Sequence, residues 1–218
     1  TVPLPISTGI SGDTGPADWP ARAQVAHGLL AMRRGDHAQA RQALDEAIER
    51  AVACGDRRAA AEACNIAVVL ARVVGDAQTG RERAGQGLAL ARAIGDRVAE
   101  LRLVTNLGAL DFGLGRHAVA RRVMAESVPL AQQLNRPGIE MVLRVNITGC
   151  DVELGDADSV CREAPVAIAL GRSLGDAVNV AVVQINHAVA LQQQGRLDQA
   201  WIEADAALRA LEPSGVPL

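Results

Sequence analysis

The chain of 218 residues has almost no aromatic side chains: one Phe, two Trp and no Tyr. None of its 22 basic residues is Lys, and a formal net charge of −3 leaves no excess of positive charge. Nucleic-acid binding usually requires a basic surface or stacking aromatic rings, and this sequence predicts neither. The apolar residues occur in stretches shorter than the roughly 18 that span a membrane. We therefore expect a globular protein that contacts neither nucleic acid nor a membrane.

Cysteine motifs and a secretory signal are also missing. Cys54, Cys64, Cys150 and Cys161 form no Cys-x-x-Cys pair and have no His at ligand spacing. We interpret them as reduced core residues of a cytoplasmic protein without a metal site. Residues 1–16 are rich in Pro, Gly, Ser and Thr, which predicts a flexible leader or a linker cut from a longer protein.

Catalytic signatures are absent as well. The sequence contains no G-x-S-x-G, H-E-x-x-H or EF-hand motif, and its regularly spaced Gly residues are isolated, not grouped in a phosphate-binding loop. His37 and His117 occupy equivalent positions two residues after a Gly, which favours packing at a turn. We interpret most carboxylates as helix caps or solvated side chains. The sequence therefore predicts no enzymatic activity, no catalytic residues and no cofactor.

The sequence does have a strict period of twenty residues. Each unit closes with Gly35, Gly55, Gly75, Gly95, Gly115, Asn135, Gly155, Gly175, Gly195 or Gly215. Gly and Asn are the residues that best tolerate the left-handed conformation at a helix end. Asp follows six of these Gly residues and can cap the next helix. Each unit therefore predicts one helix of about four turns, joined by a tight turn to an antiparallel neighbour.

Alternate units differ, so the structural repeat is a helix pair of forty residues. We predict first helices over roughly 17–34, 57–74, 97–114, 137–154 and 177–194, and second helices over roughly 37–54, 77–94, 117–134, 157–174 and 197–211. The repeat domain would span 17–212, followed by a short tail over 213–218. Pro165 lies inside one predicted helix, which should kink near 161–165 or begin late.

A motif recurs within the helix pairs. It is most complete in the third pair, where Asn106-Leu107-Gly108 is followed by Gly115-Arg116 and Ala120. These residues resemble the tetratricopeptide repeat (TPR), which has N-L-G-x-x-x-x-x-x-G-[DR]-x-x-x-A at matching places. The resemblance implies an all-α solenoid of about five antiparallel helix pairs, wound as a right-handed superhelix. HEAT and armadillo arrays share the longer period and are the alternative, although no Pro recurs here in the first helix.

The period of forty exceeds the usual TPR length of about 34. Aliphatic residues or His also replace the aromatic residues of the family. Both features are similar to the repeats of bacterial signal-responsive transcription activators, such as the maltose-operon activator. The resemblance implies a non-enzymatic binding module, the sensor or interaction region of a bacterial regulator. Its first helices would line a concave face that binds a peptide, a protein or a small effector.

Four Asn residues are the first candidates for such binding. Asn106, Asn146 and Asn186 recur every forty residues, so they should form a column on one wall. Asn65 is one residue out of phase and would point about 100° away, unless its helix carries an extra residue. Amides can bond an extended peptide whatever its sequence, as in the similar asparagine ladder of O-linked N-acetylglucosamine transferases. Alternatively, each Asn bonds the backbone of the adjacent repeat and fixes the stacking angle.

The same phase predicts further groove residues. These include Arg22, Arg33, Arg72, Arg102, Thr105, Phe112 and Gln192, together with Glu62, Val142 and Val182. The Arg residues would make the N-terminal half of the groove basic and suited to an acidic ligand, whereas the later repeats are more apolar. The alternative is that these Arg side chains are only solvated.

The last predicted helix carries an apolar stripe. Leu197, Trp201, Ala204 and Leu208 share one side of it, and no obvious capping helix follows. An uncovered stripe predicts self-association or the removal of neighbouring repeats. The alternative function is therefore a structural scaffold that assembles through its open ends.

Overall fold

The computed structural model describes residues 20–211, which form ten α-helices and contain no strand within that range. The odd-numbered helices are α1 (Ala21–Arg33), α3 (Arg57–Val74), α5 (Arg97–Gly113), α7 (Pro137–Glu153) and α9 (Ala177–Gln193). The even-numbered helices are α2 (His37–Ala53), α4 (Ala77–Ala93), α6 (His117–Gln133), α8 (Ala157–Leu174) and α10 (Leu197–Leu211). All ten match the predicted helices closely, although α1 begins at Ala21. The predicted residues 17–19 of α1, the leader and the tail lie outside the described residues.

Local chemistry sets the helix ends. The eight Gly residues of the series within residues 20–211 have φ between 66° and 79°, and Asn135 has φ of 49°. Asp caps α2, α3, α4, α5, α8 and α9, as where Gln39 N donates to Asp36 Oδ1 at 3.0 Å. Helices α6 and α7 follow turns that carry Arg, and neither has a side-chain cap. The twenty-residue period is therefore a series of helix stops and starts.

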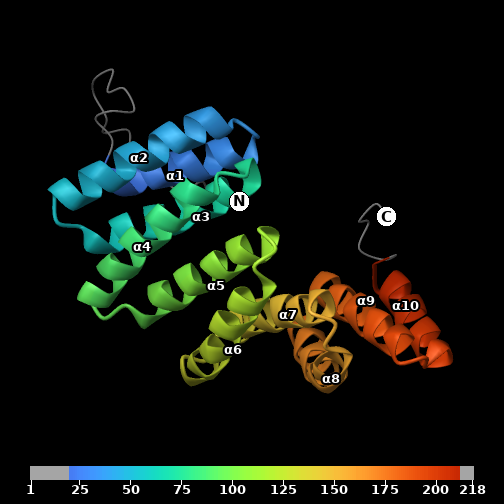
Figure 1. Ribbon diagram of the computed structural model, residues 1–218. Helices are drawn as coiled ribbons and strands as arrows, with labels where there is room; N and C mark the ends of the chain where they lie inside the picture. The colour runs from blue at the N-terminus through green and yellow to red at the C-terminus, as the bar shows by residue number, and fades with distance from the viewer. Residues whose placement is uncertain (1–19, 212–218) are drawn as a thin grey trace, which may run out of the picture.

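The odd-numbered and even-numbered helices form two layers, and neighbouring helices lie closer together in the odd-numbered layer. Each helix packs on its neighbours in the chain, and each odd-numbered helix also contacts the next odd-numbered helix. No two even-numbered helices within residues 20–211 share a comparable contact. Figure 1 shows the pairs following one another along an arc from α1 and α2 to α9 and α10. Because the odd-numbered helices lie closer together, the arc curves toward them, and their free surface is the concave face.

Small residues bring neighbouring helices together. A Cβ atom on Gly108 of α5 would lie 2.6 Å from Met124 Cε of α6, so no larger residue fits there without a shift. A Cβ atom on Gly87 of α4 would lie 2.8 Å from Leu103 Cδ2 of α5. Such close helix packing leaves little space for rings, which accounts for the shortage of aromatic residues.

Ion pairs connect successive helix pairs. Arg81 of α4 bonds Asp111 of α5 at 2.8 Å, and Arg121 of α6 bonds Asp151 of α7 at 2.5 Å. The Asp151 side chain is fully buried, and this burial raises the pKa of its carboxyl group although Arg121 acts to lower it. Asp111 and Asp151 are therefore neither caps nor solvated side chains. These two are exceptions to the prediction for most carboxylates, because they neutralise Arg residues that reach across from the previous pair.

Helix α8 runs without interruption from Ala157 to Leu174 through Pro165. The predicted late start is therefore wrong. Pro165 lies on the exposed side, as does Pro129 inside α6, so each ring projects into solvent instead of displacing a packed neighbour. Pro137 is the first residue of α7, where a missing N–H costs nothing.

The four Cys residues occupy two kinds of environment. Cys64 and Cys150 are buried free thiols, and desolvation raises the pKa of each to about 11. Cys54 is exposed and Cys161 is partly buried. The prediction of core positions is thus confirmed for Cys64 and Cys150 and wrong for Cys54, which lies in the last turn before a Gly.

Candidate functional site: the face of the odd-numbered helices

A polar pocket of about 320 Å³ opens on the odd-numbered helices. It lies between α3 and α5 and is bordered by the turn that precedes α7. Its walls are formed by Arg58, Ala61, Glu62, Asn65, Asp96, Val98, Ala99, Arg102 and Arg136. Three of the sequence-predicted groove residues, Glu62, Asn65 and Arg102, therefore meet in one pocket. The sequence analysis missed Arg58, Asp96 and Arg136. Asp96 and Arg136 lie in turns between helices and Arg58 lies in the first turn of α3, whereas the prediction considered only positions along one face of the first helices.

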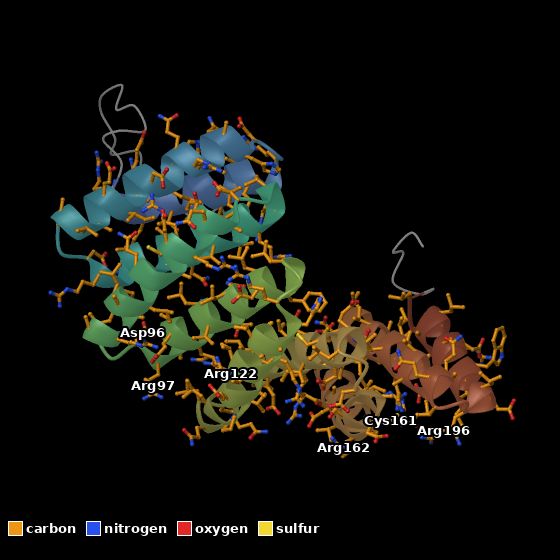
Figure 2. The ribbon with its side chains drawn as sticks, in the orientation of Figure 1. Asp96, Arg97, Arg122, Cys161, Arg162 and Arg196 are labelled. Atoms are coloured by element: carbon orange, nitrogen blue, oxygen red, sulfur yellow. The ribbon has the colours of Figure 1, made fainter. Side chains whose placement is uncertain are left out.

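One pair of charges in the pocket is already neutralised. Arg58 Nε lies 3.4 Å from Asp96 Oδ2. The other carboxylate oxygen of Asp96 accepts the N–H of Ala99 at 3.0 Å and so caps α5. Figure 2 shows Asp96 at the turn between α4 and α5, beside Arg97. Asp96 thus joins the start of α5 to α3 and forms a fixed border of the pocket.

The remaining charges of the pocket have no partner within residues 20–211. Arg102, Arg136 and Glu62 are exposed, and none forms an ion pair or a side-chain hydrogen bond with another described residue. Glu62 and Arg102 occupy equivalent positions in successive first helices. The pocket therefore presents two free guanidinium groups and one free carboxylate to solvent. These groups can bind an acidic group and a donor group side by side.

Asn65 lines this pocket, and Asn106 of α5 bonds to it. Asn106 Nδ2 of α5 donates to Asn65 Oδ1 of α3 at 2.8 Å. The prediction that Asn65 points away from Asn106 is therefore wrong. Helices α3 and α5 are offset, so Asn65, although one position out of the forty-residue phase, reaches Asn106 diagonally. Asn65 Nδ2 and Asn106 Oδ1 have no partner among the described residues and remain able to donate and accept.

The other two Asn residues do not continue this pairing. Asn186 Nδ2 of α9 donates to Thr148 Oγ1 of α7 at 3.1 Å. Asn146 Nδ2 donates to Val142 O in its own helix at 2.8 Å. The Asn residues thus lie on one face, but they do not form a uniform ladder. The alternative prediction is correct that Asn106 and Asn186 bond the adjacent repeat, but wrong about the backbone, because both bonds join side chains.

The three Arg residues predicted nearer the N-terminus lie outside the pocket. Arg22 is exposed and its Nε lies 3.3 Å from Asp56 Oδ2. The N–H of Ala59 and, secondarily, Arg22 hold the pKa of Asp56 below its ordinary value. Arg33 and Arg72 are exposed in the last turns of α1 and α3, where they complement the helix dipole. The alternative prediction, that the Arg side chains are only solvated, therefore holds for Arg33 and Arg72, whereas Arg102 lines the pocket.

Thr105, Phe112 and Gln192 have three different environments. Thr105 is 6% exposed, and its hydroxyl donates to Leu101 O at 2.8 Å, so it is an interior residue and the groove prediction is wrong for it. Phe112 is partly buried and packs edge-on against His117 with ring centroids 5.2 Å apart. This contact confirms the packing role predicted for His117. Gln192 is exposed and borders a different, apolar groove.

The C-terminal half of the concave face is apolar. Val142 of α7 and Val178 and Val182 of α9 are 37%, 47% and 38% exposed. Val142 and Val182 occupy the helix position that Glu62 and Arg102 occupy in α3 and α5. The face therefore changes from charged to apolar between α5 and α7, as the sequence predicted.

A second hollow lies at the end of the array. This apolar end groove has a volume of about 550 Å³ between α9 and α10. It is lined by Ile185, Ala188, Val189, Gln192, Leu197, Ala200, Trp201, Ala204, Ala207, Leu208 and Leu211. Trp201 is 74% exposed, Leu197 63% and Leu208 48%, which confirms the predicted uncovered stripe.

Two further findings concern residues 20–211 as a whole. No group of three or more His, Cys, Asp or Glu side chains in this part of the chain lies close enough to hold a metal ion. None of the ten described helices is both long and apolar enough to cross a membrane.

Known proteins resemble this chain in structure. No protein-family model and no curated protein matches it. The apo form of RapI superposes with a TM-score of 0.80 at 14% identity, over 89% of this chain and 71% of RapI. A Rap protein complexed with competence and sporulation factor gives 0.72 at 14% identity, over 87% and 53% of the two chains. A Podospora anserina protein with nearly identical TPR-like repeats gives 0.72 at 12% identity, over 93% and 99%.

At these identities the likeness establishes the fold. The chain is a TPR-like α-solenoid of five helix pairs, as its Gly, Asn and Ala positions predicted.

Proposed function

We propose that the chain is the interaction module of a regulatory protein and that its concave face binds an extended peptide or protein segment. The observation that carries this proposal is the pocket in which Glu62, Arg102 and Arg136 have no partner among the described residues. Charged groups held without internal partners on a concave wall are ready to pair with a ligand. A Rap protein of the same fold forms a complex with competence and sporulation factor, which supports such a role.

The chemistry of the pocket defines the segment that fits. An acidic side chain or terminal carboxylate would bind between Arg102 and Arg136, and a donor group of the same segment would bind Glu62. The free amide groups of Asn65 and Asn106 would bond the backbone of the segment. Beyond α5, apolar side chains of the segment would lie on Val142 and Val182. The proposed ligand is therefore acidic at one end and apolar at the other.

The setting that we propose is a bacterial, cytoplasmic regulator. The forty-residue repeats resemble those of signal-responsive activators such as the maltose-operon activator, where an array of this kind senses an effector or partner. The proposal assigns binding, and no reaction, to this module.

Selection from a displayed library of random peptides tests the proposal. The selected peptides should combine an acidic residue with an apolar stretch and bind more weakly as salt increases. Replacing Arg102 and Arg136 together by Ala should lower the affinity by about tenfold or more, measured by isothermal titration calorimetry. Arg33→Ala, which removes an exposed Arg outside the pocket, is the matched control and should leave the affinity unchanged. Equal effects of both variants would contradict the proposed site.

A structural scaffold is the second candidate, and the exposed apolar end groove favours it. Replacing Asn106, Asn146 and Asn186 by Ala separates the two functions. A binding module should lose affinity for the selected peptides in this variant. A protein that keeps this affinity while its stability falls would use these Asn residues for stacking alone.

A further inference from the structure

The end groove is one of a series of equivalent surfaces. Between α7 and α9, for example, Ala164 and Ile168 of α8 pack against Val180 and Val183 of α9 and are buried. Ala204 and Leu208 are the equivalent residues of α10, forty positions later, and Leu208 is 48% exposed. Within residues 20–211, the surface that receives a helix elsewhere in the array is therefore open on α9 and α10.

One position distinguishes this open surface from the surfaces of α2, α4 and α6. The helix position of Arg41, Arg81 and Arg121 is occupied by Cys161 in α8 and by Trp201 in α10. Each Arg forms an ion pair with an Asp of the following helix pair, located either in its first helix or in the turn between its two helices. Trp201 cannot form such an ion pair, and it has the largest exposed fraction among the exposed large apolar residues of the described chain. The end groove is therefore matched to an apolar partner surface, not to another Asp-bearing helix of the array.

The two ends of the array are chemically different. A hollow at the first pair is bordered by Gln24, Glu46, Glu49, Arg50 and Ala53 and is therefore polar. The residues that border the end groove include no charged side chain. Joining the two unlike ends would remove Glu46 and Glu49 from water against Trp201, which is unfavourable. Joining two end grooves would cover apolar surface with apolar surface.

The end groove combines bulky and small apolar residues. Trp201, Leu197 and Leu208 form a bulky ridge on α10. Ala188, Ala200 and Ala204 provide small positions beside that ridge. A two-fold rotation would place the ridge of one copy against the small residues of the other. Both copies would then cover their exposed Trp at once.

We propose that a second copy of this chain covers the end groove, in a closed two-fold dimer in which α9 and α10 of both copies pack together. Trp201 is the central contact of this interface. The proposal is independent of the binding proposed for the concave face, since the charged pocket between α3 and α5 lies outside the end groove. The dimer would present two concave faces at once.

Sedimentation equilibrium tests the dimer. At about 100 µM, where an interface of micromolar Kd is largely occupied, the protein should have twice the chain mass. Trp201→Glu should give a monomer, and Trp201→Ala should raise the dissociation constant of the dimer by about thirty-fold or more. Val119→Glu places the same charge at a 43% exposed position of α6 and should remain dimeric. A wild-type protein that is monomeric at this concentration would overturn the proposal.

A second set of variants separates two-fold pairing from head-to-tail assembly. Leu30→Glu alters the opposite end of the array, at a 46% exposed residue of α1. Two-fold pairing should survive Leu30→Glu, and mixing this variant with Trp201→Glu should not form heterodimers. Loss of association with Leu30→Glu, or masses that keep growing with concentration, would show head-to-tail assembly and overturn the dimer. Leu208→Gln provides an independent disruption, and circular dichroism verifies that each variant is folded.

Discussion

The N-terminal and C-terminal halves of the concave face share one backbone plan and differ in surface. At one repeated position the chain has Arg22, Glu62, Arg102, Val142 and Val182, and all five are exposed. Packing does not choose the residue at an exposed position, so the change from charged to apolar is not required by the fold. The comparison therefore separates two kinds of information: buried positions specify the array, and exposed positions specify what it binds.

Removing the ion pair that connects α6 to α7 should have the largest effect on the free energy of unfolding. Arg121→Ala leaves the buried Asp151 carboxylate without its partner and should lower the free energy of unfolding by about 3 kcal/mol. Arg22→Ala also removes an Arg–Asp pair, but one with a 71% exposed Arg, and should cost less than about 0.5 kcal/mol. Urea denaturation compares the two. Equal losses would show that water reaches Asp151 and replaces Arg121.

Exchanging surface character between the halves should change binding by a smaller amount. Arg102→Val gives α5 the residue that α7 and α9 have at this position. Affinity for the selected acidic peptides should fall by about tenfold, and the salt dependence of binding should decrease. Val182→Ala removes only apolar contact and should reduce affinity by about three-fold, without changing the salt dependence. Calorimetric titrations at two salt concentrations distinguish these results.

Helix caps should act alike in both halves. Asp156→Ala, which uncaps α8, should cost about 1 kcal/mol of unfolding free energy near neutral pH. Hydrogen bonds from Ser159 hold the pKa of Asp156 below its ordinary value. The stabilisation is therefore complete above the ordinary Asp pKa of about 4 and is lost as the pH falls through the lower folded-state pKa. Thermal melts between neutral and acid pH check this.

Two further variants provide the controls for the caps. Asp156→Asn keeps a capping oxygen and should retain most of the stability with a weaker dependence on pH. Asp76, the cap of α4 in the other half, also has a lowered pKa because it accepts bonds from Thr79, so Asp76→Ala should show the same direction of change. A cap that mattered in only one half would contradict the shared backbone plan.

The smallest expected difference is in the stability lost when Asn65 or Asn146 is replaced by Ala. Asn65→Ala removes a bond between α3 and α5 and leaves Asn106 without a partner, which should cost about 1 kcal/mol. Asn146 bonds only its own helix, so Asn146→Ala should cost less than about 0.5 kcal/mol. Chemical denaturation of both variants measures this. The reverse order would mean that Asn146 supports the stack in a way that its single bond does not indicate.

The sequence predicted helix ends well because these depend on adjacent residues. Gly95 and Asp96 determine a stop and a start whatever lies around them. It also predicted that the later concave face is apolar, since Val142 and Val182 follow from position alone.

Side-chain partners were harder to predict, because they depend on the offset between helices. Asn65 meets Asn106 although a single-helix phase argument separates them. Thr105 and Asn106 are adjacent in sequence, yet Thr105 bonds its own backbone inside the core. Arg121 and Asp151 could have been found, since Arg81 and Asp111 repeat the same spacing forty residues earlier.

The unequal spacing of the two layers has a mechanical consequence. Within residues 20–211, the even-numbered helices share few contacts with one another and can separate or approach with little loss of contact, whereas the odd-numbered helices cannot. The array should therefore bend like a strip whose stiffness resides in one layer only. Small rotations at each of five pairs would add up to a large displacement of the ends. Any molecule that bridges α3 and α5 would bind to the stiff layer of odd-numbered helices and so change how easily the whole array bends.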